Sequence, residues 1–159
     1  MKYWILFSFI AITNACWALE IPKDFEASLG PGTDSKLWIQ PKSLETVSIS
    51  NDKLDDFEVG ATKDPYAEIK ETVEAKARTL SWVLNIKNWK IIDSTSNSKD
   101  GSQLILFFGS YLDSSNDLTM FAEAYWFPKK GEPESYLFTR TKQPYTAQEL
   151  AQRFKVQLP

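Results

Sequence analysis

The fold of this chain is decided by two segments, QLILFF at residues 103–108 and LTMFAEAYWF at residues 118–127, with a polar stretch between them. Every residue from Leu104 to Phe108 is apolar, which is typical of a strand buried on both faces of a sheet. The intervening residues 113–117 are rich in turn formers, and so short a connection favours antiparallel pairing. We therefore expect these strands near the middle of a sheet that is covered on both sides.

Further strand patterns lie on either side of this pair. With 103–112 and 118–127, the segments 89–95 and 135–141 complete an expected antiparallel meander of four strands. Two smaller strands are expected earlier, at 37–39 and 46–50, and 57–59 favours a third. Residues 19–36 contain two Pro and two Gly with little periodicity, so an extended arm is expected there.

Two helices are expected around the meander. The long one covers about 65–86, with Asp64 as N-cap and Pro65 at the first helical position. Its apolar stripe consists of Ile69, Val73, Ala77, Leu80 and Leu84. Trp82 lies off this stripe and Trp89 soon follows, and both are expected at the core or its rim. The short helix covers about 147–156, where Thr146 and Glu149 form a capping box.

These patterns predict an α+β fold. It is an antiparallel four-stranded meander packed by one long helix and a short C-terminal helix, with small N-terminal strands. We expect three regions: a signal peptide at 1–18, the arm at 19–36, and a single α+β domain at 37–159. No second apolar run approaches the roughly 20 residues that span a bilayer, so no membrane span is expected.

The first eighteen residues have the pattern of an export signal. Lys2 is followed by the apolar run 3–12, which is too short to span a bilayer, and Ala18 offers a cleavage point. The pattern predicts a periplasmic or secreted protein. Residues 13–16 loosely resemble a bacterial lipobox, in which Cys16 would carry a lipid anchor. Because Thr13 stands where such boxes usually have Leu, a small residue near a cleavage site is the preferred interpretation.

The composition excludes several kinds of chemistry. The chain contains no His, and its single Cys is Cys16, so zinc sites, Ser-His-Asp triads and Cys-His dyads are excluded. No P-loop, G-x-S-x-G or G-x-G-x-x-G motif is present, and no cofactor or metal is expected. The basic residues are scattered among more numerous acids, and the net charge is -3, which argues against a nucleic-acid partner.

The strand 118–127 presents two different faces. Paired alanines permit close approach of a helix, so we assign the face with Ala122 and Ala124 to the long helix. The opposite face then offers an aromatic surface around one carboxylate, which suits the binding of a ligand or partner. Its residues are Phe121, Glu123, Tyr125 and Phe127. The alternative is that the arm and small strands cover this face and that Glu123 pairs with a neighbour such as Arg140.

The order of elements resembles the Mog1/PsbP/DcrB group of α/β sandwich domains. Residues 64–66 (DPY), which open the long helix, and residues 136–139 (YLFT), in the last strand, stand where that layout would place them. The resemblance covers about residues 37–156 and rests on layout. It implies a protein that works through binding or assembly, since that group is mostly non-enzymatic, and no functional residue carries over.

The leading functional expectation is therefore an exported, non-catalytic binding module that recognises a protein partner, as an accessory or immunity-type protein does. One alternative is a small-ligand-binding protein with a pocket at the aromatic sheet face. Another is an enzyme that uses carboxylate, Ser or Lys chemistry. A partner-binding protein should show an exposed apolar patch, a ligand-binding protein a closed pocket, and an enzyme converging polar groups with shifted pKa values.

Overall fold

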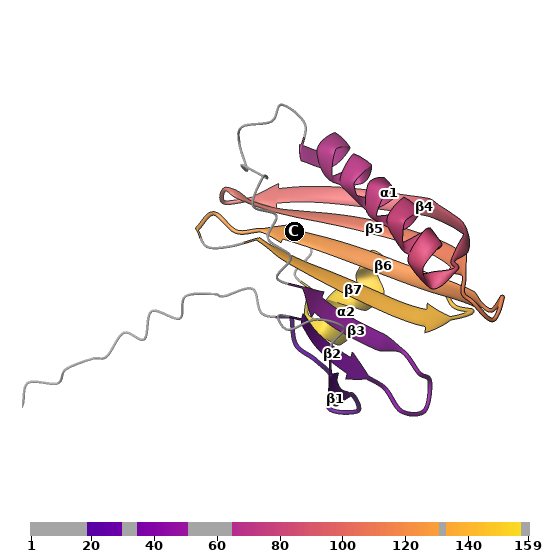
Figure 1. The fold of residues 1–159 in the computed structure, drawn as a ribbon. Helices are drawn as coiled ribbons and strands as arrows, with labels where there is room; N and C mark the ends of the chain where they lie inside the picture. The colour runs from indigo at the N-terminus through magenta and orange to yellow at the C-terminus, as the bar shows by residue number, and fades with distance from the viewer. Residues whose placement is uncertain (1–18, 30–34, 51–64, 131–132, 157–159) are drawn as a thin grey trace, which may run out of the picture.

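One antiparallel sheet with a helix on each face makes up the structure (Figure 1). The computed structural model describes residues 19–29, 35–50, 65–130 and 133–156. The elements are β1 (Glu26–Leu29), β2 (Ser35–Ile39), β3 (Thr46–Ser50), α1 (Pro65–Leu84), β4 (Lys87–Lys99), β5 (Ser102–Leu112), β6 (Leu118–Phe127), β7 (Glu134–Thr141) and α2 (Ala147–Phe154). The seven strands lie in the order β1-β2-β3-β7-β6-β5-β4.

The predicted α+β fold class is confirmed, and the meander β4 to β7 forms with consecutive strands as neighbours. Two differences stand out. The region expected to be an extended arm contributes β1, which pairs with β2 at the edge of the sheet, and β4 runs well beyond the expected 89–95. The strand expected at 57–59, the N-cap Asp64 and the signal peptide expected at 1–18 lie outside the described residues.

The larger core lies between the sheet and α2. From β6 it takes the face with Ala122 and Ala124, and from α2 it takes Leu150 and Phe154. The assignment of the long helix to this alanine face is therefore wrong. Volume is the physical reason, because the two small side chains leave room for the large rings that fill this core, such as Phe154.

The smaller core lies between the sheet and α1. Ile69 and Val73 of the helix are fully buried against aromatic side chains of β5 and β6, namely Phe107, Tyr125 and Phe127. Figure 1 shows α1 lying along the face formed by β4, β5 and β6, while α2 lies on the other face behind β7 and β3. The long helix thus covers the face that was predicted to offer a binding surface or, alternatively, to be covered by the arm and small strands.

Phe154 provides a test of the larger core. Its ring lies 4.9 Å from that of Phe138 and 5.8 Å from that of Phe25, measured between centroids. We expect Phe154→Ala to lower the free energy of unfolding by about 3–5 kcal/mol, because it leaves a cavity between helix and sheet. Denaturant unfolding measures the loss. The control is Trp82→Ala at an exposed aromatic, which should cost about 0.5 kcal/mol or less; equal losses would contradict this packing.

Candidate functional site

The four residues predicted to form a binding surface lie together on the α1 side of β6, but they are buried. Phe121, Glu123, Tyr125 and Phe127 expose 7% of their surface or less. The Tyr125 hydroxyl donates a hydrogen bond of 2.7 Å to Glu123 Oε1, so the carboxylate is engaged within the core. As folded, these residues offer no open surface, and their role in binding stays a prediction.

The alternative pairing of Glu123 with Arg140 is wrong. Glu123 is opposite Leu137 on β7, whereas Arg140 is opposite Met120. Residues 123 and 140 therefore point to opposite faces of the sheet. Arg140 instead binds Glu149 of α2 through two hydrogen bonds.

Three of the exposed large apolar side chains lie at the C-terminal end of α1, while Leu44, Ile92 and Leu118 are exposed elsewhere. Trp82, Val83 and Leu84 are 91%, 73% and 54% exposed, and we call these three residues the helix-end patch. The predicted stripe holds for Ile69, Val73 and Ala77, whereas Leu84 is exposed and the side chain of Leu80 lies outside the described ones. Trp82 is not at the core. The signal in the sequence was that Trp82 lies off the stripe while its neighbours are also apolar.

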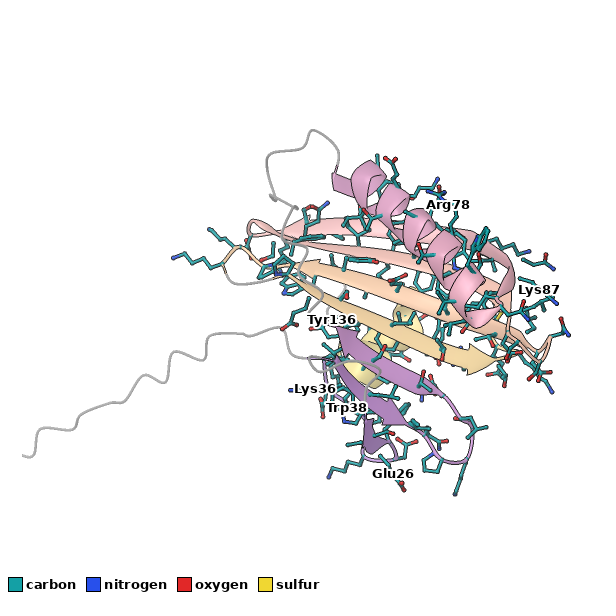
Figure 2. The ribbon with its side chains drawn as sticks, viewed as in Figure 1. Glu26, Lys36, Trp38, Arg78, Lys87 and Tyr136 are labelled. Atoms are coloured by element: carbon teal, nitrogen blue, oxygen red, sulfur yellow. The ribbon has the colours of Figure 1, made fainter. Side chains whose placement is uncertain are left out.

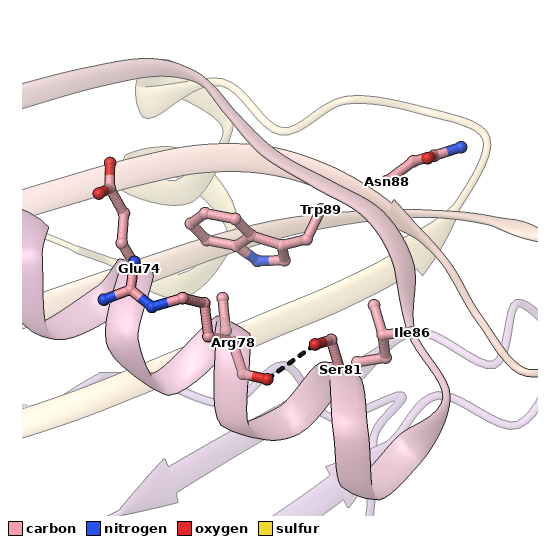
Figure 3. Close-up of a pocket in the computed structure, with 7 residues that line it drawn as sticks. Glu74, Arg78, Ser81, Ile86, Asn88 and Trp89 are labelled. Carbon is pink, nitrogen blue, oxygen red and sulfur yellow. Dashed lines mark hydrogen bonds between the residues drawn. The ribbon is translucent and has the colours of Figure 1, made fainter.

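A pocket of about 420 Å³ lies beside this patch, between α1 and the start of β4 (Figure 3). It is lined by Glu74, Ala77, Arg78, Ser81, Ile86, Asn88 and Trp89. β4 departs from regular pairing between Lys87 and Lys90, and Asn88 has a left-handed φ of 54° within that irregularity. Such a bulge re-aims side chains. In Figure 3 the indole of Trp89 points toward α1, while Asn88 points away.

A stack of aromatic rings fixes the Trp89 wall of the pocket. The indole lies nearly parallel to the ring of Phe121, at 5.7 Å between centroids and 13° between planes. Phe121 in turn lies over Gly109 of β5, where an added Cβ would stand 2.3 Å from Phe121 Cζ and 2.4 Å from the Lys90 carbonyl oxygen. Glycine is therefore required at position 109, because only a residue without Cβ lets the Phe121 ring pack so close to the backbone of β5. Phe121 in turn fixes the position of Trp89.

Two opposite charges stand on the rim of the pocket. Glu74 and Arg78 are one helical turn apart, yet within the described part of the chain no hydrogen bond or ion pair joins their side chains. The Ser81 hydroxyl donates to the Arg78 backbone carbonyl at 2.7 Å. No described residue forms a hydrogen bond or ion pair with the Arg78 guanidinium. Arg78 and Lys87 lie on the side of the molecule where α1 and β4 meet (Figure 2).

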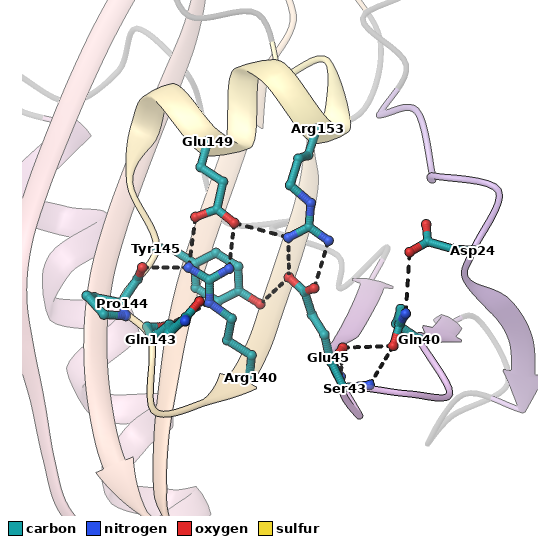
Figure 4. Close-up of polar contacts among 10 residues, drawn as sticks. All are labelled: Asp24, Gln40, Ser43, Glu45, Arg140, Gln143, Pro144, Tyr145, Glu149 and Arg153. Atoms are coloured by element: carbon teal, nitrogen blue, oxygen red, sulfur yellow. Dashed lines mark hydrogen bonds and ion pairs between the residues drawn. The ribbon is translucent and has the colours of Figure 1, made fainter.

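A second polar cluster ties α2 to the sheet (Figure 4). Glu45, which is buried just before β3, accepts hydrogen bonds from the Tyr145 hydroxyl at 2.9 Å and from Arg153 at 2.8 and 3.1 Å. Arg153 also contacts Glu149 at 3.0 Å, and Arg140 lies over the Tyr145 ring at 4.1 Å. Each charged group in this cluster has a partner of opposite charge.

The pKa shifts in this cluster follow from those contacts. The hydrogen bond from Arg140 is the largest cause that holds the pKa of Glu149 below its ordinary value of 4.5. Burial, reinforced by the charge of Glu45, raises the pKa of Tyr145. The shifts therefore reflect saturated contacts that stabilise the fold, and none of these groups lines the pocket.

Among residues 19–29, 35–50, 65–130 and 133–156, no group of three or more Asp, Glu, Cys or His side chains is placed to hold a metal ion. No helix in these ranges combines the length and apolar character needed to cross a bilayer.

Gly109→Ala tests the support of the pocket wall. The added methyl group must displace Phe121, so we expect the free energy of unfolding to fall by about 1–3 kcal/mol. The indole N–H signal of Trp89 should move in the NMR spectrum, because its stacking partner shifts. The control is Gly101→Ala, whose Cβ meets only the flexible side chain of Lys129 at 3.4 Å and whose strain comes from its φ of 83°. An unmoved Trp89 signal in Gly109→Ala would contradict the support.

Glu149→Gln tests the cluster around Glu45 through pH. Because the pKa of Glu149 is depressed in the folded state, its charge stabilises the fold above pH 4.5, and this contribution is lost as pH falls through the depressed pKa. We expect the variant to be less stable at pH 7 by about 1–2 kcal/mol. The difference in melting temperature from the wild type should shrink below pH 4.5. A difference that stays constant to low pH would contradict this assignment.

Comparison with known proteins bears on the fold. No protein-family model matches this chain, and no curated protein is significantly similar to it in sequence. Among solved structures, the Saccharomyces cerevisiae Ran-binding protein Mog1p is similar, with a TM-score of 0.48 and 11% identity over 87% of this chain and 77% of that chain. The predicted resemblance to the Mog1 type of fold is thus confirmed. The likeness concerns the fold alone, and no residue or partner carries over from it.

The same comparison gives the predicted localisation no support. The solved structure of similar fold belongs to a Ran-binding protein, and nothing in that comparison points to a periplasmic or secreted protein. The signal peptide expected at 1–18 and the lipid anchor at Cys16 both lie outside the described residues.

Proposed function

We propose that this protein is a non-catalytic module that binds a protein partner at the C-terminal end of α1. The observation that carries the proposal is the exposure of Trp82, Val83 and Leu84 in consecutive positions. Tryptophan dominates the energy of many protein interfaces, because burying its ring removes a large apolar area from water. Val83 and Leu84 follow Trp82 in the sequence but point in other directions around the helix, so Trp82 is the anchor of the proposed site.

The edges of the sheet are poorer docking sites than the helix end. β4 is long enough to pair with another strand, but it carries Lys87, Lys90 and Lys99 and is irregular at two places. Charged and bulged edges resist strand addition. β1 at the other edge has four residues, which offers little backbone to pair. The geometry therefore favours docking through side chains at the helix end.

Binding of a small ligand is the second candidate. The specific observation in its favour is the pocket beside the patch. Trp89 forms one wall of this pocket and stacks on Phe121 of the aromatic face. The pocket is open rather than enclosed, which suits an anchoring side chain better than an isolated small molecule. An accessory or immunity-type role stays a prediction, as does the absence of catalysis.

Capture with matched variants tests the proposal. Tagged wild type, Trp82→Ser and Leu84→Ser are incubated with lysate of the cells that produce the protein, and the bound proteins are quantified by mass spectrometry. We expect one protein in stoichiometric amount on the wild type and about tenfold less on both variants, because the anchor is lost.

Leu44→Ser is the control, since Leu44 is 70% exposed in the turn between β2 and β3, far along the chain from the patch. It should capture as much partner as the wild type, and all variants should keep the wild-type melting temperature. Equal capture by all four proteins, or no partner on the wild type, would refute docking at the helix end.

A further inference from the structure

We propose that the pocket between α1 and β4 receives a bulky apolar side chain from an acidic segment of the partner, whose carboxylate pairs with Arg78. This inference rests on the proposed function and adds the chemistry of the partner. It concerns the seven residues that line the pocket beside the end of α1.

The pocket has the size and walls for one anchoring side chain. Its volume of about 420 Å³ lies near the lower end of the range of roughly 300–1,000 Å³ for ligand pockets. Ala77, Ile86 and the indole of Trp89 make its apolar surface. Because Trp89 is held by its parallel stack on the buried Phe121, this wall is already in place before a partner arrives.

Arg78 supplies the polar contact at the rim. Its exposed guanidinium has no hydrogen-bond or ion-pair partner among the described residues, and its donors match the two oxygens of a carboxylate. Glu74 stands one helical turn nearer the start of α1. It repels a second carboxylate, so the acidic group of the partner is directed to the Arg78 end of the rim and the segment has one preferred register.

The charge of Arg78 favours the same partner. Lys87, the next cation along the chain, donates a hydrogen bond to Asn116 in a turn that also contains Asp113 and Asp117, so its charge is offset there. The attraction for an acidic segment therefore comes from Arg78, which repels a basic one. A lipid surface would require only the protruding patch, whereas the walled pocket is suited to a side chain.

Two matched peptides test this chemistry. Both are acetylated hexapeptides that contain leucine and one central tryptophan; their charged positions are glutamate in one and lysine in the other. Binding to the full chain is followed by NMR titration of the Trp89 indole and the Arg78 side chain. We expect the glutamate peptide to bind and the lysine peptide to bind at least about tenfold more weakly.

Arg78→Gln should lower the affinity for the glutamate peptide by about tenfold. It should also make that affinity less dependent on salt concentration. Arg78→Lys should restore part of the affinity, since it restores the charge. Lys70→Gln removes an exposed charge from the same helix and should change nothing. Equal binding of both peptides, binding of neither, or insensitivity to Arg78→Gln would overturn the proposed chemistry.

The failure of this inference differs from that of the proposed function. If Trp82→Ser abolishes capture of the cellular partner while the peptides do not depend on Arg78, the docking surface stands and its chemistry is wrong. If vesicles with anionic lipid bind in a Trp82-dependent manner and neither peptide binds, the surface meets a membrane, and the inference is overturned. If Trp82→Ser has no effect on capture, the proposed function itself fails.

Discussion

The burial of β5 and β6 on both faces is the constraint on which the rest of the structure depends. The middle of each strand is enclosed on both sides, so neither face of the sheet can be left to water. Two separate coverings are then required, and the chain supplies α1 on one side and α2 on the other. β7 and β3 extend the sheet, so that its surface is wide enough for α2 to bury Leu150 and Phe154 against it.

Much of this arrangement follows from local patterns in the sequence. The continuous apolar run in β5, the period-two alternation in β6 and the capping box of α2 each identify an element and its limits to within a few residues. Alternation shows that Ala122 and Tyr125 face opposite ways, but it does not say which helix covers which face. That choice depends on the volumes of side chains distant in sequence, such as Phe138 and Phe154, which fill the alanine side.

The candidate site was less accessible to sequence reasoning. Trp82 and Leu84 are apolar, and the simplest expectation for apolar side chains in an amphipathic helix is burial. Their exposure depends on where α1 meets the sheet and where it ends, which is a property of the whole fold. The bulge that turns Trp89 toward the pocket likewise depends on pairing with β5. Similarly, Glu45 and Arg153 are 108 residues apart, and no local pattern joins them.

The helix α1 is packed against the sheet along only part of its length, and this has a consequence for its motion. In the described residues, the buried apolar contacts of the helix are Ile69, Val73 and Ala77, all within its first two thirds, and its last turn is held by backbone hydrogen bonds that water can reach. Opening that turn exposes little new apolar surface, so it costs much less than global unfolding. Amide hydrogens near Leu84 should exchange with solvent well before those near Val73. Contact with another molecule would then order the helix from its loose end and slow that exchange.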